Sequence, residues 1–224
     1  MSAPLQASLL DFNGDDLPSG PAGAISLGPL GSTVIRRPLT AGAWLDVRPG
    51  WLSGADALFD RLLAEVPWRA EEREMYQRVV AVPRLQCFYD EGRPLPHPVL
   101  EQARDLLSAH YADELGEPFR TAGLCLYRDG RDSVAWHGDR VGRSRTEDTM
   151  VAILSVGAAR PLLLRPVPGS PAGNGAGTLR YHLGHGDLVV MGGSCQRTWE
   201  HAVPKTGRTV GPRISIQFRP RGVR

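Results

Sequence analysis

The sequence predicts a mainly β fold with flanking helices (α+β), in which the two sheets of a jelly roll or barrel close over a pocket. Two amphipathic helical segments occur in the first half of the chain, and short apolar runs separated by turn residues fill the second half. The 224 residues include 42% hydrophobic and 22% charged residues, which is ordinary for one globular domain with its own core. These observations favour a single β-rich domain supported by helices.

The helical segments come first. Residues 53–66 are expected to form a helix, with Ser53 and Asp56 as its capping pattern. A second helix is expected at about 98–115, and residues 79–89 between the two are rich in Val, Phe and Tyr and are expected to be extended. The apolar stripe of the second helix comprises Leu100, Ala103, Leu107 and Tyr111.

Eight short runs with strand character follow Gly116. Turn residues separate them, and so many strands at such close spacing are typical of a jelly roll or barrel. The Pro- and Gly-rich insert at 166–177 is expected to be a loop. The predicted strands are 122–127, 133–137, 150–156, 162–165, 179–183, 187–191, 198–203 and 214–218.

The chain is expected to have two parts. Residues 1–31 are expected to form a flexible leader, because Gly, Pro and Ser recur there without a sustained apolar period. Residues 32–224 are expected to form one domain, with the jelly-roll core at about 120–220 and helical and extended support at 32–119.

Composition also bears on location and partners. No apolar stretch approaches the roughly 18 residues that a spanning helix needs, so no membrane partner is expected. Cys87, Cys125 and Cys195 fit neither a disulfide framework nor a CxxC zinc knuckle, which favours a reducing cytoplasm. The net charge of +2 is no strong nucleic-acid signal.

A His-Gly-Asp tripeptide occurs twice, at 137–139 and at 185–187. Side chains at i and i+2 share one face of an extended strand, so the imidazole and the carboxylate can grip one ion. One copy alone is weak evidence, as the duplicate shows. The second copy leads into an apolar strand, where its Gly and Asp suit a turn, so we expect His185 to be structural. The first copy follows a polar turn, as a metal site at a barrel mouth would.

His201 and two later arginines extend the first copy into a candidate active site. A 2-His-1-carboxylate triad binds one face of Fe(II) and leaves positions open for a cosubstrate and dioxygen. Arg213, Ser215, Gln217 and Arg219 share one face of a strand by period two. The planar fork of arginine suits a carboxylate of a dicarboxylate cosubstrate. A zinc hydrolase would use the same ligands but would not require the arginines.

At these residues the chain resembles the AlkB-like family of Fe(II)/2-oxoglutarate-dependent dioxygenases that repair alkylated nucleic acids. The resemblance covers roughly residues 60–220, with a weaker match VPRLQ at 82–86. The stronger motifs are LCLYRDGRDSVAWHGD at 124–139, LGHGDLVVM at 183–191, TWEHAVPK at 198–205 and PRISIQFR at 212–219.

The resemblance implies a double-stranded β-helix with His137, Asp139 and His201 on Fe(II). It further implies that Arg213 pairs with the distal carboxylate of 2-oxoglutarate, supported by Tyr127. Arg219 would lie near the cosubstrate and the metal ligands. The positions of Cys125 and Ser215, where the family usually has Asn, would line the cosubstrate pocket.

The implied reaction consumes 2-oxoglutarate and O2 and releases succinate and CO2 while it removes a methyl group from an alkylated base as formaldehyde. The expected partner is alkylated DNA or RNA, in single-stranded form, and the chain is expected to be a monomer. Flipped bases need an aromatic or apolar sandwich. The candidate substrate contacts are Trp136, Phe88, Tyr89 and Arg140.

Two departures from the family pattern keep other functions open. Arg140 and Val141 stand where the family has further acids, and the segment after Tyr89 is shorter than the hairpin that supplies a base-stacking aromatic. One alternative is the same oxygenase chemistry on a small molecule or a protein. Another is a module that binds a metal or a damaged base without turnover.

Overall fold

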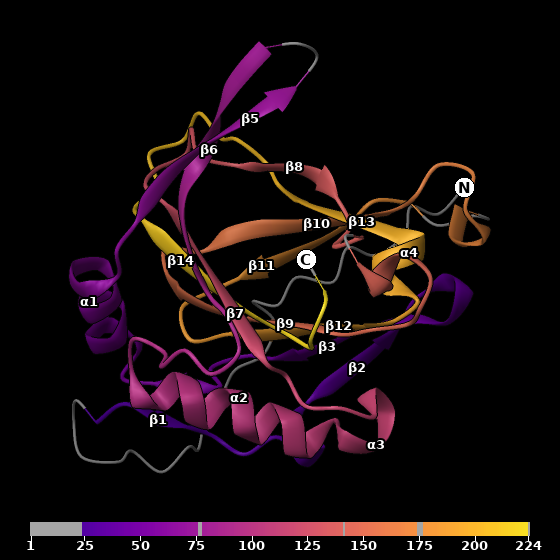
Figure 1. Cartoon of the computed structure of the whole chain (residues 1–224), viewed down its shortest axis with the longest axis horizontal. Coiled ribbons are helices and arrows are strands. Elements are labelled where there is room, and N and C mark those ends of the chain that lie inside the picture. The colour runs from indigo at the N-terminus through magenta and orange to yellow at the C-terminus, as the bar shows by residue number, and fades with distance from the viewer. Residues whose placement is uncertain (1–23, 76–77, 141, 174–176, 224) are drawn as a thin grey trace, which may run out of the picture.

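Two β-sheets pack face to face in the computed structural model, which describes residues 24–75, 78–140, 142–173 and 177–223 (Figure 1). The major sheet has eight strands, in the spatial order β2 (Ile35–Pro38), β3 (Ala43–Arg48), β12 (Leu188–Gly193), β9 (Val151–Gly157), β14 (Arg213–Arg219), β7 (Thr121–Tyr127), β6 (Arg78–Tyr89) and β5 (Arg69–Met75). The minor sheet has four, in the order β11 (Leu179–Leu183), β10 (Arg160–Pro166), β13 (Trp199–Val203) and β8 (Val134–His137).

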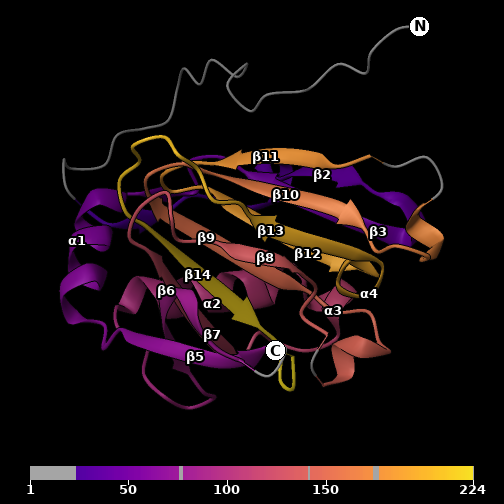
Figure 2. The same ribbon diagram turned by 90° about the horizontal axis from the view of Figure 1, so that it is seen from above.

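This arrangement confirms the predicted jelly roll, and each of the eight predicted runs forms a strand. The neighbours of the central strand β14 are β9 and β7, which are far from it in sequence, and both pairings are antiparallel. Short strands β1 (Ser26–Leu27) and β4 (Leu52–Ser53) form a separate pair. In Figure 2 the minor-sheet strands β11, β10 and β13 lie together on one side of the molecule.

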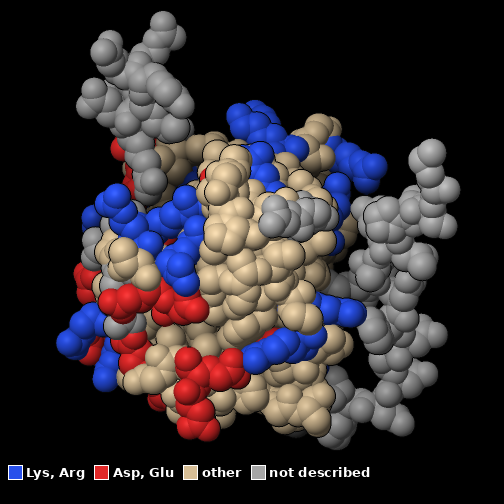
Figure 3. Space-filling model, turned by 90° about the vertical axis from the view of Figure 1, so that its right-hand side faces the viewer, with Lys and Arg blue, Asp and Glu red and all other residues tan. Residues whose placement is uncertain are grey.

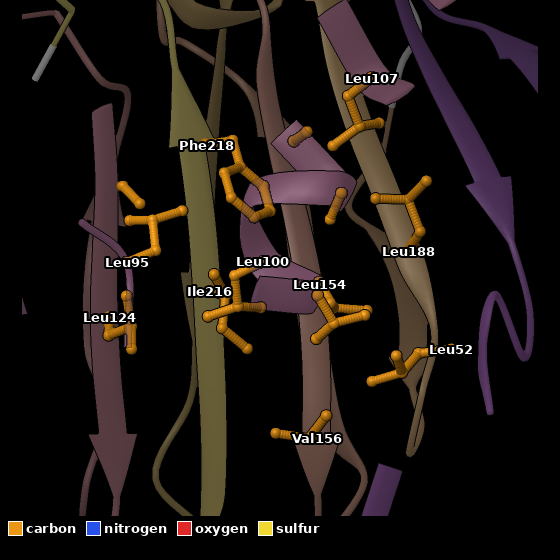
Figure 4. Close-up of a cluster of buried hydrophobic side chains, with 14 of the residues drawn as sticks. Leu52, Leu95, Leu100, Leu107, Leu124, Leu154, Val156, Leu188, Ile216 and Phe218 are labelled. Carbon is orange, nitrogen blue, oxygen red and sulfur yellow. The ribbon is translucent and has the colours of Figure 1, made fainter. Parts of the chain in front are cut away.

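The major sheet is buried on both faces because its strands alternate between two cores. On β14, Ile214, Ile216 and Phe218 are completely buried in one core. Ile216 and Phe218 point toward α2 (Pro98–His110) in Figure 4. Burying each such side chain contributes roughly 1.5–3 kcal/mol. The opposite face packs toward the minor sheet, with Leu164 and Trp199 in the second core. The polar residues of β14 therefore face the space between the sheets.

The two predicted helices form, with different ends. Helix α1 (Ala55–Glu65) begins after Gly54, which has φ +69°, so the expected cap by Ser53 was wrong: Ser53 belongs to β4 and makes no cap. The expected helix 98–115 is broken at Tyr111 into α2 and α3 (Ala112–Leu115). The Tyr111 hydroxyl donates to Asp46 of β3 at 2.9 Å, so the residue at the break is hydrogen-bonded to the major sheet.

The expected boundary of the leader was too late. Strand β1 lies inside 1–31 and pairs with β4, while residues 1–23 of the expected leader lie outside the described residues. Strand β5 was not predicted. It forms a hairpin with β6, which projects from the sandwich (Figure 1), and residues 76–77 between the two strands are not described. In the described part of the chain, no helix is long and apolar enough to cross a membrane.

Candidate active site

Strands β8 and β13 bring the two candidate histidines together. His137 and His201 are direct Cα partners across this antiparallel pair, and their ring centroids are 4.2 Å apart. Asp139 follows β8 directly, and its Oδ1 lies 3.8 Å from Nε2 of His137. One ligand atom from each residue lies within 4.8 Å of the other two. This donor set and its compactness fit a facial triad on a single metal ion.

Hydrogen bonds to neighbouring groups orient two of the three ligands, His137 and Asp139. Nδ1 of His137 lies 2.9 Å from the carbonyl of Ala135, which leaves Nε2 directed at the site. Arg219 donates from Nε to Oδ2 of Asp139 at 2.7 Å, so Oδ1 remains for a metal. The backbone N–H of Asp139 donates to Oε1 of Gln196 at 3.0 Å. Such outer-sphere hydrogen bonds fix ligand geometry before the ion arrives.

Electrostatics keep the ligands in the protonation states that a metal needs. Burial raises the pKa of Asp139, but electrostatic interactions, above all with the Arg219 guanidinium, outweigh it and hold that pKa well below its usual range. Burial and the neighbouring His137 lower the pKa of His201 to about 3. Asp139 is therefore a carboxylate and His201 a neutral imidazole near neutral pH.

Arg213 provides a second binding element. Its guanidinium is buried at the start of β14, and Nη2 donates to Oγ of Ser155 at 2.7 Å. Its Nε and Nη1 are buried without a hydrogen-bond partner. Buried donors without partners are costly, and a hydrogen bond from a guanidinium N–H to a carboxylate is charge-assisted and strong. The open donors of Arg213 therefore fit a carboxylate of the cosubstrate.

Tyr127 lies beside this fork, with its ring centroid 5.4 Å from the guanidinium carbon of Arg213. Burial raises the pKa of Tyr127 to about 12, so the hydroxyl keeps its proton and can donate to a carboxylate. The guanidinium of Arg160 lies 5.8 Å from the same ring and donates to the carbonyls of Asp129, Asp132 and Pro204. Two buried arginines, Arg213 and Arg160, thus lie beside the ring of Tyr127.

Cys125 and Ser215 are cross-strand partners on β7 and β14, and both are buried. The carboxamide Nε2 of Gln217 donates to Oγ of Ser215 at 3.1 Å and to Sγ of Cys125 at 3.6 Å. Sequence reasoning placed Gln217 only on the polar face and missed these contacts. The spacing of two residues from Ser215 and from Arg219 was the sequence feature that could have indicated contacts of Gln217 with both side chains.

The candidate substrate residues separate into different regions. Tyr89 was wrong as a clamp, because it is only 4% exposed in the core beneath α2. Trp136 points to the outer face of the minor sheet, opposite His137, where the Arg165 guanidinium lies 4.3 Å from its ring centroid. Phe88 lies beside Gly123 on the inner face of the major sheet. Arg140 donates from Nε to the carbonyl of Gln196 at 3.2 Å.

The second tripeptide is a turn, as expected. Nδ1 of His185 accepts from the N–H of Gly157 at 2.7 Å. The carboxylate of Asp187 accepts from the N–H groups of Gly50 and Gly184, at 2.9 and 2.7 Å. These contacts occupy the side chains in joining loops, and Nε2 of His185 lies 3.2 Å from Oδ1 of Asp56. Among the described residues, no group of three potential metal ligands forms here.

A model of the 2OG-Fe(II) oxygenase superfamily matches residues 46–219. The alpha-ketoglutarate-dependent dioxygenase alkB homolog 3 of Bos taurus is 33% identical over 78% of this chain and 66% of its own length; the Homo sapiens protein of that name is 31% identical over 88% and 71%. The Homo sapiens DNA oxidative demethylase ALKBH2 is 27% identical over 74% of this chain and 68% of its own length. The alignments thus span about two thirds of these relatives.

Solved structures support the fold. The structure of OsALKBH1 superposes with a TM-score of 0.55 at 13% identity, over 83% of this chain and 100% of that one. A prolyl hydroxylase from Trichoplax adhaerens superposes with a TM-score of 0.56 at 11% identity, over 80% of this chain and 83% of that one. The family match covers most of the domain and includes both site strands, so the chain belongs to the 2OG-Fe(II) oxygenase superfamily and, within it, to the AlkB-like family.

Proposed function

We propose that this protein is an Fe(II)- and 2-oxoglutarate-dependent dioxygenase that oxidatively demethylates alkylated bases in single-stranded DNA or RNA. The observation that carries the proposal is the pairing of a compact His-Asp-His triad with a buried arginine whose Nε and Nη1 lack partners. A metal-binding module or a zinc hydrolase has no use for that second element. The substrate class is supported by the relatives named for alkB homolog 3 and DNA oxidative demethylation.

In this proposal His137, Asp139 and His201 hold Fe(II), and Arg213 with Tyr127 holds the distal carboxylate of 2-oxoglutarate. Bound Fe(II) would supply the activation of O2: one oxygen atom would enter succinate as 2-oxoglutarate loses CO2, and the other would enter the methyl group. The hydroxymethylated base then releases formaldehyde and regains its N–H. Arg219 keeps Oδ2 of Asp139 occupied, so the carboxylate presents Oδ1 to the metal. Asp139 and His201 are buried, whereas the His137 side chain is 37% exposed, so the site opens to the surface on the side of His137.

The surface is compatible with a nucleic-acid partner. Figure 3 shows basic side chains gathered over the upper half of one face and acidic ones over its lower left. Phosphate neutralisation by such groups makes binding weaken as salt increases. We further propose that the protein acts as a monomer. We also propose a reducing cytoplasm as its compartment, which is supported by three free cysteines. Sedimentation of the purified protein tests the first claim.

The decisive experiment is mass spectrometry of methylated single- and double-stranded oligonucleotides after incubation with Fe(II), 2-oxoglutarate and O2. We expect methylated single strands to lose the mass of one CH2 unit, as N–CH3 becomes N–H, with matching succinate, and we expect neither product from His137→Ala. Succinate without any demethylated oligonucleotide would reject the nucleic-acid substrate and favour a small molecule or protein. Absence of succinate under every condition would reject the oxygenase.

A further inference from the structure

Asp139 is held through a chain of side chains on β14. Arg219 donates from Nε to Oδ2 of Asp139 at 2.7 Å and from Nη2 to Oε1 of Gln217 at 2.8 Å. The guanidinium is thus bound at two points, one on the candidate metal ligand and one on the carboxamide. Because the planar fork of an arginine is pre-organised, less side-chain entropy is lost for each hydrogen bond that it forms.

The two ends of the Gln217 carboxamide have different partners. Nε2 donates to Ser215 Oγ at 3.1 Å and to Cys125 Sγ at 3.6 Å, while Oε1 accepts from Arg219. A flipped amide would place its N–H groups against a guanidinium, which has donors only. The orientation of the carboxamide therefore follows from its surroundings and directs an acceptor at Arg219.

Strand β7 leaves room for this pair at Gly123. A Cβ atom added to Gly123 would lie 3.0 Å from Nη1 of Arg219 and 3.6 Å from Oε1 of Gln217. An added methyl would require the Arg219 guanidinium to shift by a few tenths of an ångström, whereas its contact with Gln217 would be an ordinary one. Gly123 thus leaves the space in which Gln217 holds Arg219.

We propose that Gln217 is a positioning residue for the metal ligand Asp139. It acts through Arg219: by holding Nη2, it keeps Nε on Oδ2 and leaves Oδ1 to the metal. This inference rests on the proposed metal centre. It accounts for a long polar side chain where β14 alternates toward the site, and it assigns Gln217 to metal affinity rather than to contact with substrate.

The test measures Co(II) affinity, since Co(II) stands in for Fe(II) with a visible spectrum and no turnover. Outer-sphere partners typically contribute about 10–100-fold to metal affinity. We expect Gln217→Met to weaken Co(II) binding by about 10-fold, with its denaturant midpoint near that of the wild type. The matched control is Gln86→Met, because Gln86 also donates to Cys125 Sγ, at 3.7 Å, and has no hydrogen bond to Arg219. We expect the control to bind Co(II) as the wild type does.

A double-mutant cycle separates positioning from packing. Arg219→Met removes the guanidinium through which Gln217 acts, so adding Gln217→Met should weaken Co(II) binding no further. Additive losses, or wild-type affinity in Gln217→Met, would overturn the inference. If Gln217→Met does not fold, Gly123→Ala replaces it, since the added methyl displaces the same guanidinium and should weaken Co(II) binding. A wild-type protein that binds no Co(II) would overturn the proposed metal centre, and the inference with it.

Discussion

The two His-Gly-Asp tripeptides have the same side chains in the same order and opposite uses. In 137–139 the histidine and the carboxylate converge on a third ligand, His201, from the neighbouring strand. In 185–187 the histidine accepts from one loop backbone and the carboxylate from two others. The tripeptide supplies the same polar side chains in both copies. Its position in the fold decides whether these side chains form a metal site or hydrogen-bond to loop backbone.

The two glycines differ as well. Gly186 has φ +85°, and an added Cβ would lie 2.5 Å from the carbonyl oxygen of Leu52. Gly138 lacks a left-handed φ, and an added Cβ would lie 2.6 Å from the carbonyl oxygen of Gln196. One glycine permits a turn, and the other permits close packing beside the metal ligand Asp139. The same residue type thus answers two different steric demands.

The largest difference is expected when each histidine is removed. His137→Ala deletes a metal ligand and should reduce succinate formation by more than the roughly 100-fold that loss of an outer-sphere partner costs. His185→Ala deletes an acceptor in a turn and should leave succinate formation within about twofold, because no metal ligand contacts it. Equal loss in both variants would remove the functional distinction between the copies.

Ligand-induced stabilisation gives the next largest effect. Mn(II) with 2-oxoglutarate, each at 100 times its dissociation constant, should stabilise the wild type by about 2.7 kcal/mol or more, because only the folded chain holds the site. His185→Ala should gain the same increment from a lower starting stability. His137→Ala should gain little. The measurement is urea unfolding with and without the ligands, and an undiminished increment in His137→Ala would contradict the assignment.

Arg213→Met sharpens the comparison within the active site. It removes the fork proposed for the distal carboxylate but no metal ligand. We expect 2-oxoglutarate binding to weaken by at least the roughly 10-fold that one charge-assisted hydrogen bond contributes, while Co(II) affinity stays near that of the wild type. Calorimetric titrations of each ligand separate the two. Parallel loss of both affinities would mean that Arg213 supports the whole site instead.

Local periodicity predicted the fold well wherever strands alternate. On β14 the apolar residues Ile214, Ile216 and Phe218 face one core, as period two requires. Strand β5 was missed because Arg69–Met75 carries three acids and little apolar alternation. Its strand state comes from pairing with β6, a partner that local sequence does not reveal. The cap of α1 was misplaced because Gly54, with its left-handed φ, took the position expected for Ser53.

The candidate site was predictable to the extent that chemistry follows spacing. The positions of His137, Asp139 and His201 predicted a triad that the structure brings together. Contacts set by cross-strand register were not predictable. Ser155 meets Arg213 because β9 pairs with β14, and Gln196 meets Asp139 because α4 (Cys195–Thr198) follows β12. Tyr89 was misassigned because strand parity turned it toward the helices.

The smallest effects are expected at the glycines of turns. Gly186→Ala should lower the free energy of unfolding by about 2 kcal/mol, since a left-handed residue with a Cβ costs about 1–2 kcal/mol and the Leu52 carbonyl adds a clash. Gly169 has φ +78° with no atom within 4 Å of an added Cβ, so Gly169→Ala isolates the backbone cost at about 1 kcal/mol. Both variants should keep wild-type Co(II) affinity.

Gly138→Ala should instead weaken Co(II) binding, because the added methyl pushes Asp139 away from Gln196. An unchanged affinity would show that this glycine does not support the metal site.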